Sequence, residues 1–166
     1  MPDIHVPNII GPIELAADPG TTGQVLTSTG PGTQPIWNTP LYAYADKTSQ
    51  VMGTSGDVTW NPPAVLNGIA YIGPGIFTLP PNKTYLLDAY MCNTAGGDTV
   101  VMQWVDDLNN LLPLALSPGY VGNLNNESRH CLAVFTPLVT TNVKVRKLSG
   151  PANTFGVSSF LAITSI

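Results

Sequence analysis

The sequence is poor in charge. Charged residues make up 10% of the 166 residues, against about 25% in an average soluble protein. Only six residues are basic, and the net charge is −4. Nucleic-acid binding requires a basic surface that neutralises phosphates, and residues 1–46 contain no Lys or Arg. The composition therefore excludes nucleic acid as the main partner.

The sequence also lacks long apolar segments. No uninterrupted run approaches the roughly 18 residues of a membrane-spanning helix. The first residues, MPDIHVPNII, have neither the positive charge nor the continuous apolar stretch of a secretory signal. We therefore expect a soluble protein that is made in a cytoplasm and has no membrane partner.

Cysteine is scarce as well. Cys92 and Cys131 are the two cysteines, and no further Cys or His is spaced to complete a zinc site with them. Without a secretion signal, we expect both to be reduced and buried thiols. A disulfide between them remains an open alternative.

No motif for catalysis is present. The sequence contains neither a G-x-S-x-G elbow nor a phosphate-binding glycine loop. Glu127, Ser128 and His130 offer the groups of a triad, but on a strand residue 127 points away from the other two. Asp106 and Asp107 lack the ligand spacing of a calcium loop, and a turn explains them. We predict no enzyme activity, no catalytic residues, no cofactor and no metal site.

The sequence is rich in apolar and turn-forming residues. Hydrophobic residues make up 43% of it, alongside 16 Gly and 16 Pro, and this apolar content is too high for a disordered chain. From Leu41 onward, short alternating runs with β-branched and aromatic residues are separated by Gly, Pro and Asn clusters. This pattern predicts an all-β head domain over 41–166, a β-sandwich of about eight to ten strands.

The predicted strands follow one another closely. They lie in LYAYADKTSQVM (41–52), GDVTW (56–60), GIAYIGPGIFTLP (68–80, folded at 73–75), TYLLDAYMCN (84–93, a central strand), SRHCLAVFTPL (128–138), TTNVKVRKL (140–148) and TFGVSSFLAITSI (154–166). In KVRK (144–147), Lys144 and Arg146 share a face and Lys147 points to the other, which indicates a solvated edge strand.

One segment is ambiguous. The spacing of apolar residues in TVVMQWVDDLNNLLP (99–113) fits one face of a helix. It also fits a strand at 99–105, a polar turn at 106–110 and a second strand in LLPLAL (111–116). The β-branched residues and the Asp/Asn cluster favour the hairpin.

Residues 1–40 differ from the rest. They hold seven prolines and no uninterrupted window for a helix or a central strand. We predict an extended, irregular N-terminal arm whose sparse apolar residues are buried by another protein. Its partner-binding anchors are Ile9, Ile10, Val25, Leu26, Ile36 and Trp37.

The segment GTTGQVLTSTGPGTQPIW (20–37) resembles a linker of tailed-bacteriophage virion proteins. The pattern is G-x-x-G-Q-V-L-T-S-x-G-x-G-x-x-P-x-W, and it matches here at Gly20, Gly23, Gln24, Val25, Leu26, Thr27, Ser28, Gly30, Gly32, Pro35 and Trp37. In that group the linker precedes a C-terminal head of fibre, appendage or decoration proteins. The resemblance covers about a tenth of the chain and implies a virion protein.

Three later fragments resemble the trimeric jelly roll of complement globular heads and tumour-necrosis-factor-like ligands. They are GIFTLPPNKTYLLDAYM (75–91), VVMQWVDDLNNLL (100–112) and SSFLAITSI (158–166), the last of which is similar to a terminal strand near the three-fold axis. The resemblance implies a homotrimeric jelly roll in which Cys92 and Cys131 lie on neighbouring strands. Phage fibres carry a long shaft, whereas this chain has a short arm.

The last segment predicts the trimer interface. Alternation in TFGVSSFLAITSI leaves apolar residues on both faces: Phe155, Val157, Leu161 and Ile163 on one, and Phe160, Ala162 and Ile166 on the other. One face belongs to the core and the second to a neighbouring subunit. The predicted interface residues are Tyr42, Tyr44, Phe160, Ala162 and Ile166; the alternative for the tyrosines is exposure to solvent.

The sequence thus predicts a bacteriophage structural protein, a homotrimeric capsid decoration (cement) protein or short appendage. Residues 1–40 would attach it to the major capsid protein or other virion proteins. The alternative is a tail-fibre or receptor-binding head that recognises host-surface glycans. Trp60 and Tyr120 are the candidates for stacking on a sugar ring, and plugging of the core is the competing explanation for both.

Overall fold

The computed structural model describes residues 24–27, 36–95, 100–113, 119–121 and 127–166, with the backbone alone at 93–95, 119–121 and 127–129. These residues form fifteen strands and no helix, so none of them belongs to a helix that could cross a membrane. Chain contacts divide the protein into a small unit, Met1–Thr39, and a large unit, Pro40–Ile166.

The small unit contains a two-stranded antiparallel sheet. β1 (Val25–Thr27) pairs with β2 (Ile36–Asn38), and Leu26 lies opposite Trp37. Within the predicted extended, irregular arm, these residues thus pair as two short strands. All three residues of β1 are exposed, and a two-stranded ribbon by itself is only marginally stable in water.

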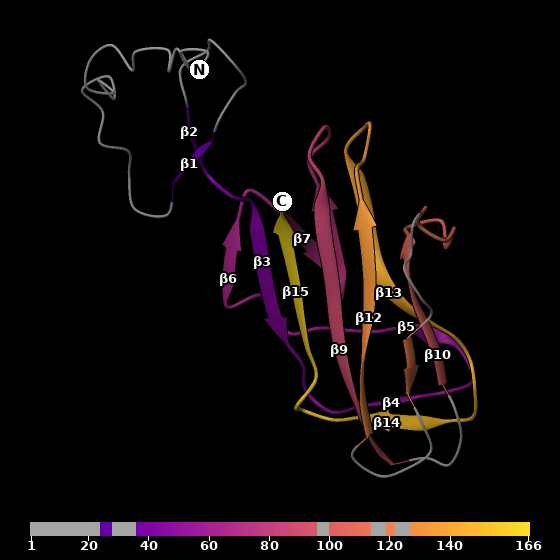
Figure 1. Ribbon diagram of the computed structural model, residues 1–166. Helices are drawn as coiled ribbons and strands as arrows, with labels where there is room; N and C mark the ends of the chain where they lie inside the picture. Colours follow the sequence, from indigo (N-terminus) through magenta and orange to yellow (C-terminus); the bar gives the residue numbers. More distant parts are fainter. Residues whose placement is uncertain (1–23, 28–35, 96–99, 114–118, 122–126) are drawn as a thin grey trace, which may run out of the picture. The chain divides into compact units, whose positions relative to one another are not determined.

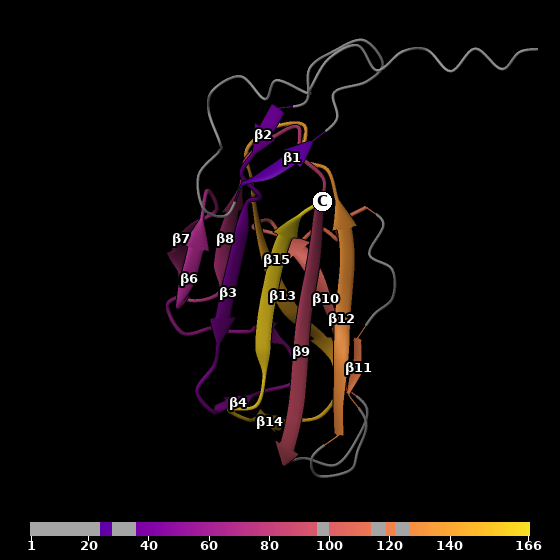
Figure 2. The same cartoon turned by 60° about the vertical axis from the view of Figure 1, so that its left-hand side comes forward.

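The large unit is a sandwich of two antiparallel sheets (Figures 1 and 2). The first, called the β13 sheet, has the order β11 (Gly119–Val121), β10 (Val100–Asp106), β13 (Thr141–Ser149), β8 (Ile76–Leu79) and β7 (Ala70–Gly73), with β5 (Gly56–Asp57) also pairing with β13.

The second, called the β9 sheet, has the order β4 (Gln50–Met52), β14 (Asn153–Phe155), β9 (Tyr85–Ala95), β15 (Phe160–Ser165), β3 (Tyr42–Asp46) and β6 (Val65–Asn67), with β12 (Glu127–Phe135) on the other side of β9. The predicted all-β jelly-roll sandwich is confirmed. Several strands are only two or three residues long, which explains why they outnumber the sequence estimate.

The core lies between the two sheets and follows the two-residue period of the strands. Fully buried side chains come from both sheets, among them Phe77, Leu79, Trp104 and Val145 from the β13 sheet and Tyr85, Leu87, Met91, Leu161 and Ile163 from the β9 sheet. The indole Nε1 of Trp104 donates a hydrogen bond to the Cys131 carbonyl oxygen at 2.9 Å. This bond joins the sheets across the core, where an unpaired donor would be costly.

Two predicted elements differ in detail. The segment 154–166 is not one strand, because a turn at Gly156–Ser159 separates β14 from β15 and leaves Val157 exposed. The hairpin prediction for 99–113 is right about β10 and the polar turn. Among the described residues, however, the strand that returns beside β10 is β11; from LLPLAL, only an isolated bridge at Leu111 is described.

The prediction for KVRK is wrong about the sheet edge. β13 lies between β10 and β8, and Lys144 and Lys147 are both buried. Lys147 points to the core side, and its Nζ donates to the carbonyl oxygens of Gly53 and Pro151 and to Asn153 Oδ1. Three acceptors satisfy an ammonium group, which explains how a lysine is accommodated there; burial lowers the pKa of Lys147.

The two cysteines lie on neighbouring strands, β9 and β12, and both are buried. Cys131 is opposite Ala89, so it is three positions from Cys92 along the ladder, or about 10 Å. A disulfide needs Cα atoms within about 7 Å. The two residues also point to opposite faces of the sheet, and no disulfide joins them.

A candidate interaction surface on the β9 sheet

The β9 sheet has one face in the core and one face turned outward. Along β9, the buried residues Tyr85, Leu87, Ala89 and Met91 alternate with Leu86, Asp88 and Tyr90, which are accessible to solvent. A solvated antiparallel sheet normally carries polar residues on its outer face. Here the outward positions of β3, β15 and β9 are mainly aromatic and aliphatic, which marks this face as unusual.

Four rings cross the outward face from strand to strand. Tyr44 on β3 stacks on Phe160 of β15, with ring centroids 6.0 Å apart. Phe160 stacks on Tyr90 of β9 at 4.9 Å, and Tyr90 contacts the imidazole of His130 on β12 at 5.0 Å. We call these four residues the aromatic row. Offset contacts of this kind stabilise neighbouring strands.

The pairing register creates this row. Phe160 and His130 both lie directly opposite Tyr90, on either side of β9. Residues directly opposite one another in antiparallel strands point to the same face. The four rings therefore come from separate parts of the sequence and meet because β15 is inserted between β3 and β9.

Further apolar side chains extend the row. Tyr42, Val65 and Leu86 are exposed on the same face, Ala162 is partly exposed, and the side chain of the terminal Ile166 is 74% exposed. Contiguous exposed apolar surface of this kind marks interaction sites in soluble proteins. Together with the aromatic row, these residues form what we call the β9 face.

One polar pair interrupts the β9 face. His130 Nδ1 lies 2.8 Å from Asp88 Oδ1 and 3.0 Å from Asp88 Oδ2. The side chains are 49% and 24% exposed, respectively. The pair sits at the β12 end of the row, directly beside Tyr90.

The five predicted interface residues lie near one another. Tyr42, Tyr44, Phe160 and Ala162 are on the outward face of adjacent strands, and Ile166 follows the end of β15. Whether they contact a second subunit stays a prediction. Sequence reasoning missed Leu86, Asp88, Tyr90 and His130, although the alternation in TYLLDAYMCN places the first three on a face opposite to the buried one.

The other predicted contact residues have different surroundings. In the small unit, Val25, Leu26 and Ile36 are exposed and Trp37 is partly exposed; Ile9 and Ile10 lie outside the described residues. The proposal that Trp60 stacks on a sugar is wrong for this structure, because Trp60 is 3% exposed and belongs to the core cluster. Tyr120 is in β11, and its side chain lies outside the described part.

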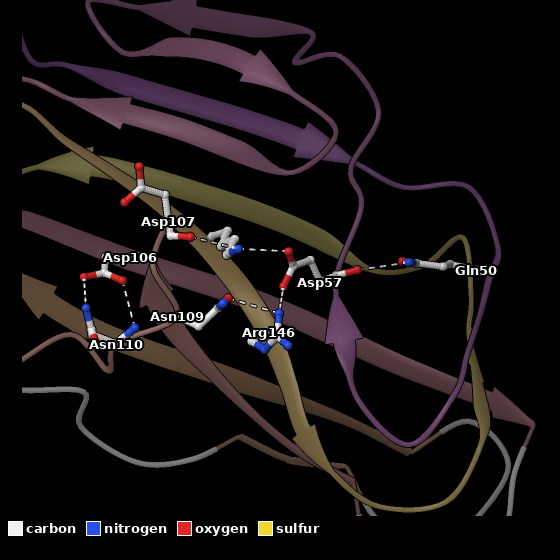
Figure 3. Close-up of polar contacts among 8 residues, drawn as sticks. Gln50, Asp57, Asp106, Asp107, Asn109, Asn110 and Arg146 are labelled. Carbon is white, nitrogen blue, oxygen red and sulfur yellow. Dashed lines mark hydrogen bonds and ion pairs between the residues drawn. The ribbon is translucent and has the colours of Figure 1, made fainter.

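A polar cluster covers part of the β13 sheet (Figure 3). Asp57 forms ion pairs with Lys144 and Arg146, and Arg146 Nη1 also donates to Asn109 Oδ1 at 3.0 Å. Burial raises the pKa of Asp57, but the hydrogen bonds and charges of Lys144 and Arg146 outweigh it and hold that pKa below its ordinary value. Each carboxylate oxygen of Asp57 is thus engaged, which indicates a structural brace.

The turn at Asp106–Asn110 is likewise held by its own side chains. Asp106 accepts hydrogen bonds from the backbone N and the Nδ2 of Asn110 (Figure 3). Asp107 Oδ2 accepts one from Asn142 Nδ2 on β13. Within the described ranges, no group of His, Cys, Asp and Glu is arranged to hold a metal ion. The geometry agrees with the turn explanation for these two aspartates.

Comparison with known proteins identifies the fold and no more. No family model and no curated protein matches the chain. The crystal structure of murine APRIL at pH 5.0 aligns with a TM-score of 0.59 and 14% identity, covering 76% of this chain and 99% of that one. The pH 8.0 structure of murine APRIL aligns with a TM-score of 0.58, 13% identity and the same coverage.

The globular domain of the zebrafish complement 1qA protein aligns with a TM-score of 0.49 and 17% identity, over 76% of this chain and 94% of that one. The murine structures show that the chain has a tumour-necrosis-factor-like jelly-roll fold.

Proposed function

We propose that the chain is a homotrimeric structural protein of a bacteriophage virion, a capsid decoration protein or short appendage. The large unit would associate through the β9 face, and residues 1–40 would attach the trimer to the particle. The observation that carries the self-association is the aromatic row, Tyr44–Phe160–Tyr90–His130, on a face with few polar groups. The virion role is supported by the linker resemblance at 20–37.

The physical case for self-association rests on what the β9 face exposes. Tyr44 is 42% exposed, and Tyr42, Val65 and Leu86 are exposed beside it. Burying apolar surface contributes about 25 cal/mol per Å², and aromatic residues dominate the energetics of protein interfaces. A second copy of the chain is the partner that is always present, and closed symmetric assemblies are the common outcome of such faces.

The arm supplies a separate attachment. Val25, Leu26 and Ile36 are exposed apolar side chains on a two-stranded ribbon, and three such arms in one trimer would act together. Linked binding events gain affinity through effective concentration. Weak contacts by each arm are therefore sufficient for stable attachment.

The self-association is tested by measuring the native mass of the full chain. We expect a trimer for the natural sequence and a folded monomer for Tyr44→Lys, because the lysine places charge within the apolar face. Ile72→Lys is the matched control: Ile72 is an exposed aliphatic residue on β7, in the other sheet. A natural chain that is monomeric at micromolar concentration would refute the proposal.

The attachment is tested with a variant that lacks residues 1–40. We expect it to remain a trimer and to lose binding to virus particles stripped of this protein. If the shortened chain is monomeric, the arm holds the subunits together instead. If it binds particles as the full chain does, attachment through the arm is wrong; retained binding to host-surface glycans by that chain would favour a receptor-binding head.

A further inference from the structure

The pair of His130 and Asp88 lies at the β12 end of the aromatic row, within the face proposed to self-associate. His130 Nδ1 faces both carboxylate oxygens of Asp88, at 2.8 and 3.0 Å. Tyr90 packs against the imidazole on the same face, with the rings 5.0 Å apart. In the single chain, half of the His130 side chain and a quarter of the Asp88 side chain are still in water.

Assembly changes this balance because it removes water from the pair. A buried carboxylate beside a neutral imidazole carries an uncompensated negative charge, which is costly in an apolar contact. A buried carboxylate beside a protonated imidazole is an ion pair with no net charge and a charge-assisted hydrogen bond. The assembled state therefore favours the protonated pair more strongly than the single chain does.

We propose that self-association through the β9 face takes up a proton at the His130–Asp88 pair, so that the assembly tightens as the pH falls from about 8 to about 6. This inference rests on the proposed self-association and names its regulation. Thermodynamic linkage fixes the sign, since the state that binds more protons is favoured at lower pH.

The other titratable groups on the β9 face do not account for such a change. β3 contributes Tyr42, Tyr44 and Asp46, and Asp46 Oδ1 accepts a hydrogen bond from Asn61. β9 contributes Tyr90 besides Asp88. Carboxyl and phenol groups ordinarily titrate outside pH 6–8, whereas imidazole titrates within it.

The neighbouring strands add no further group in the described part. The outward positions of β15 hold Phe160, Ala162 and Thr164, which do not titrate. On β12, Glu127 and Arg129 lie on either side of Ser128, and their side chains are outside the described part of the chain.

The test is sedimentation equilibrium of the full chain at pH 8, 7 and 6 and constant ionic strength. We expect the association constant per copy to rise by up to about tenfold for each pH unit lowered, the limit for one proton taken up. His130→Gln should assemble with a flat pH profile, because glutamine can still donate to Asp88 but does not titrate. Asp46→Asn is the control carboxylate on the same face and should keep the natural slope.

Asp88→Asn gives the sharpest outcome. Without the carboxylate, burial favours the neutral imidazole, so assembly should weaken as the pH falls and the sign of the slope should reverse. A natural chain that assembles equally at all three pH values, or a His130→Gln variant with the natural slope, overturns the inference and leaves the proposed function standing. A monomer at every pH overturns the proposed function itself.

Discussion

Lys47 gives a prediction that is worked from the structure. It follows β3 and is 2% exposed, yet no carboxylate of the described residues pairs with it. Its Nζ donates to Gln50 Oε1 and to the Thr59 carbonyl oxygen at 2.8 Å, and it lies 5.7 Å from the centre of the Trp60 ring. Burial lowers the pKa of Lys47 from 10.5 to about 8. We therefore expect Lys47 to carry a stability penalty at neutral pH.

The magnitude follows from the shift in pKa. Each pH unit corresponds to about 1.4 kcal/mol, so the protonated form costs at most about 3 kcal/mol in the folded state. Lys47→Met removes this penalty but leaves the Thr59 carbonyl oxygen without its donor, which costs about 1–2 kcal/mol. At pH 7 the variant should therefore be more stable by about 1–2 kcal/mol.

The sign of the pH dependence is fixed by the lowered pKa. Below pH 8 the lysine is protonated in both the folded and the unfolded state, and the full penalty is present. Between pH 8 and 10.5 the folded state loses its proton first, so the natural chain gains stability as the pH rises. The stability difference between the two proteins should consequently shrink and then reverse.

Urea denaturation followed by circular dichroism measures this difference between pH 7 and 10. The protein concentration must be fixed, because assembly adds to the apparent stability. Lys147 also has a lowered pKa with the same sign, but it is present in both proteins and cancels. A difference that is independent of pH would refute the assignment of the penalty to Lys47.

Three further substitutions should lower the free energy of unfolding by calorimetry or urea titration. Trp104→Phe removes the indole that fills the core and donates to Cys131, at a cost of about 2–3 kcal/mol. Asp57→Asn leaves the buried Lys144 without its ion pair, which lowers the stability by about 1–2 kcal/mol. Because the pKa of Asp57 is lowered in the folded state, the natural chain should lose the stability of this ion pair below about pH 4, whereas the variant should show no such loss. Gly75→Ala places a side chain at φ +94° against a backbone carbonyl oxygen, at about 2 kcal/mol or more. An unchanged midpoint in any of the three would contradict the contact described for it.

Local alternation predicted the strands but not their neighbours. In TYLLDAYMCN the alternation of side chains predicted a strand, and the structure confirms it, because every second residue from Tyr85 to Met91 is buried. In KVRK the period correctly placed Lys144 and Arg146 on one face, since both reach Asp57. The edge prediction failed because strand order depends on pairings between distant segments. The charges of the segment did not reveal that Asp57 would pair with Lys144 and Arg146, or that the carbonyl oxygen of Gly53 would accept a hydrogen bond from Lys147.

The candidate surface was predicted in part for the same reason. Alternation in the last strand predicted that Phe160 and Ala162 share the face that is not part of the core. Tyr44, on the first strand of the head domain, was predicted to accompany them on that face. Tyr90 and His130 were missed because only the register, in which both Phe160 and His130 lie opposite Tyr90, brings the rings together. For Trp60 the sequence left two explanations open, a sugar-stacking ring in a loop before two prolines or a plug of the core, and its burial in the core cluster decides for the second.

The position of β15 has a consequence for synthesis of the chain. β15 is synthesised after both β3 and β9, yet it lies between them, and β3 has β15 and β6 as its partners. Until β15 emerges, β3 can pair only with β6 and stays separate from β9. The edge of β9 that β15 later covers is open during this time. Unpaired edges of this kind template aggregation. Nascent chains stalled shortly before residue 160 should therefore require chaperones, whereas the completed chain closes its own sheet.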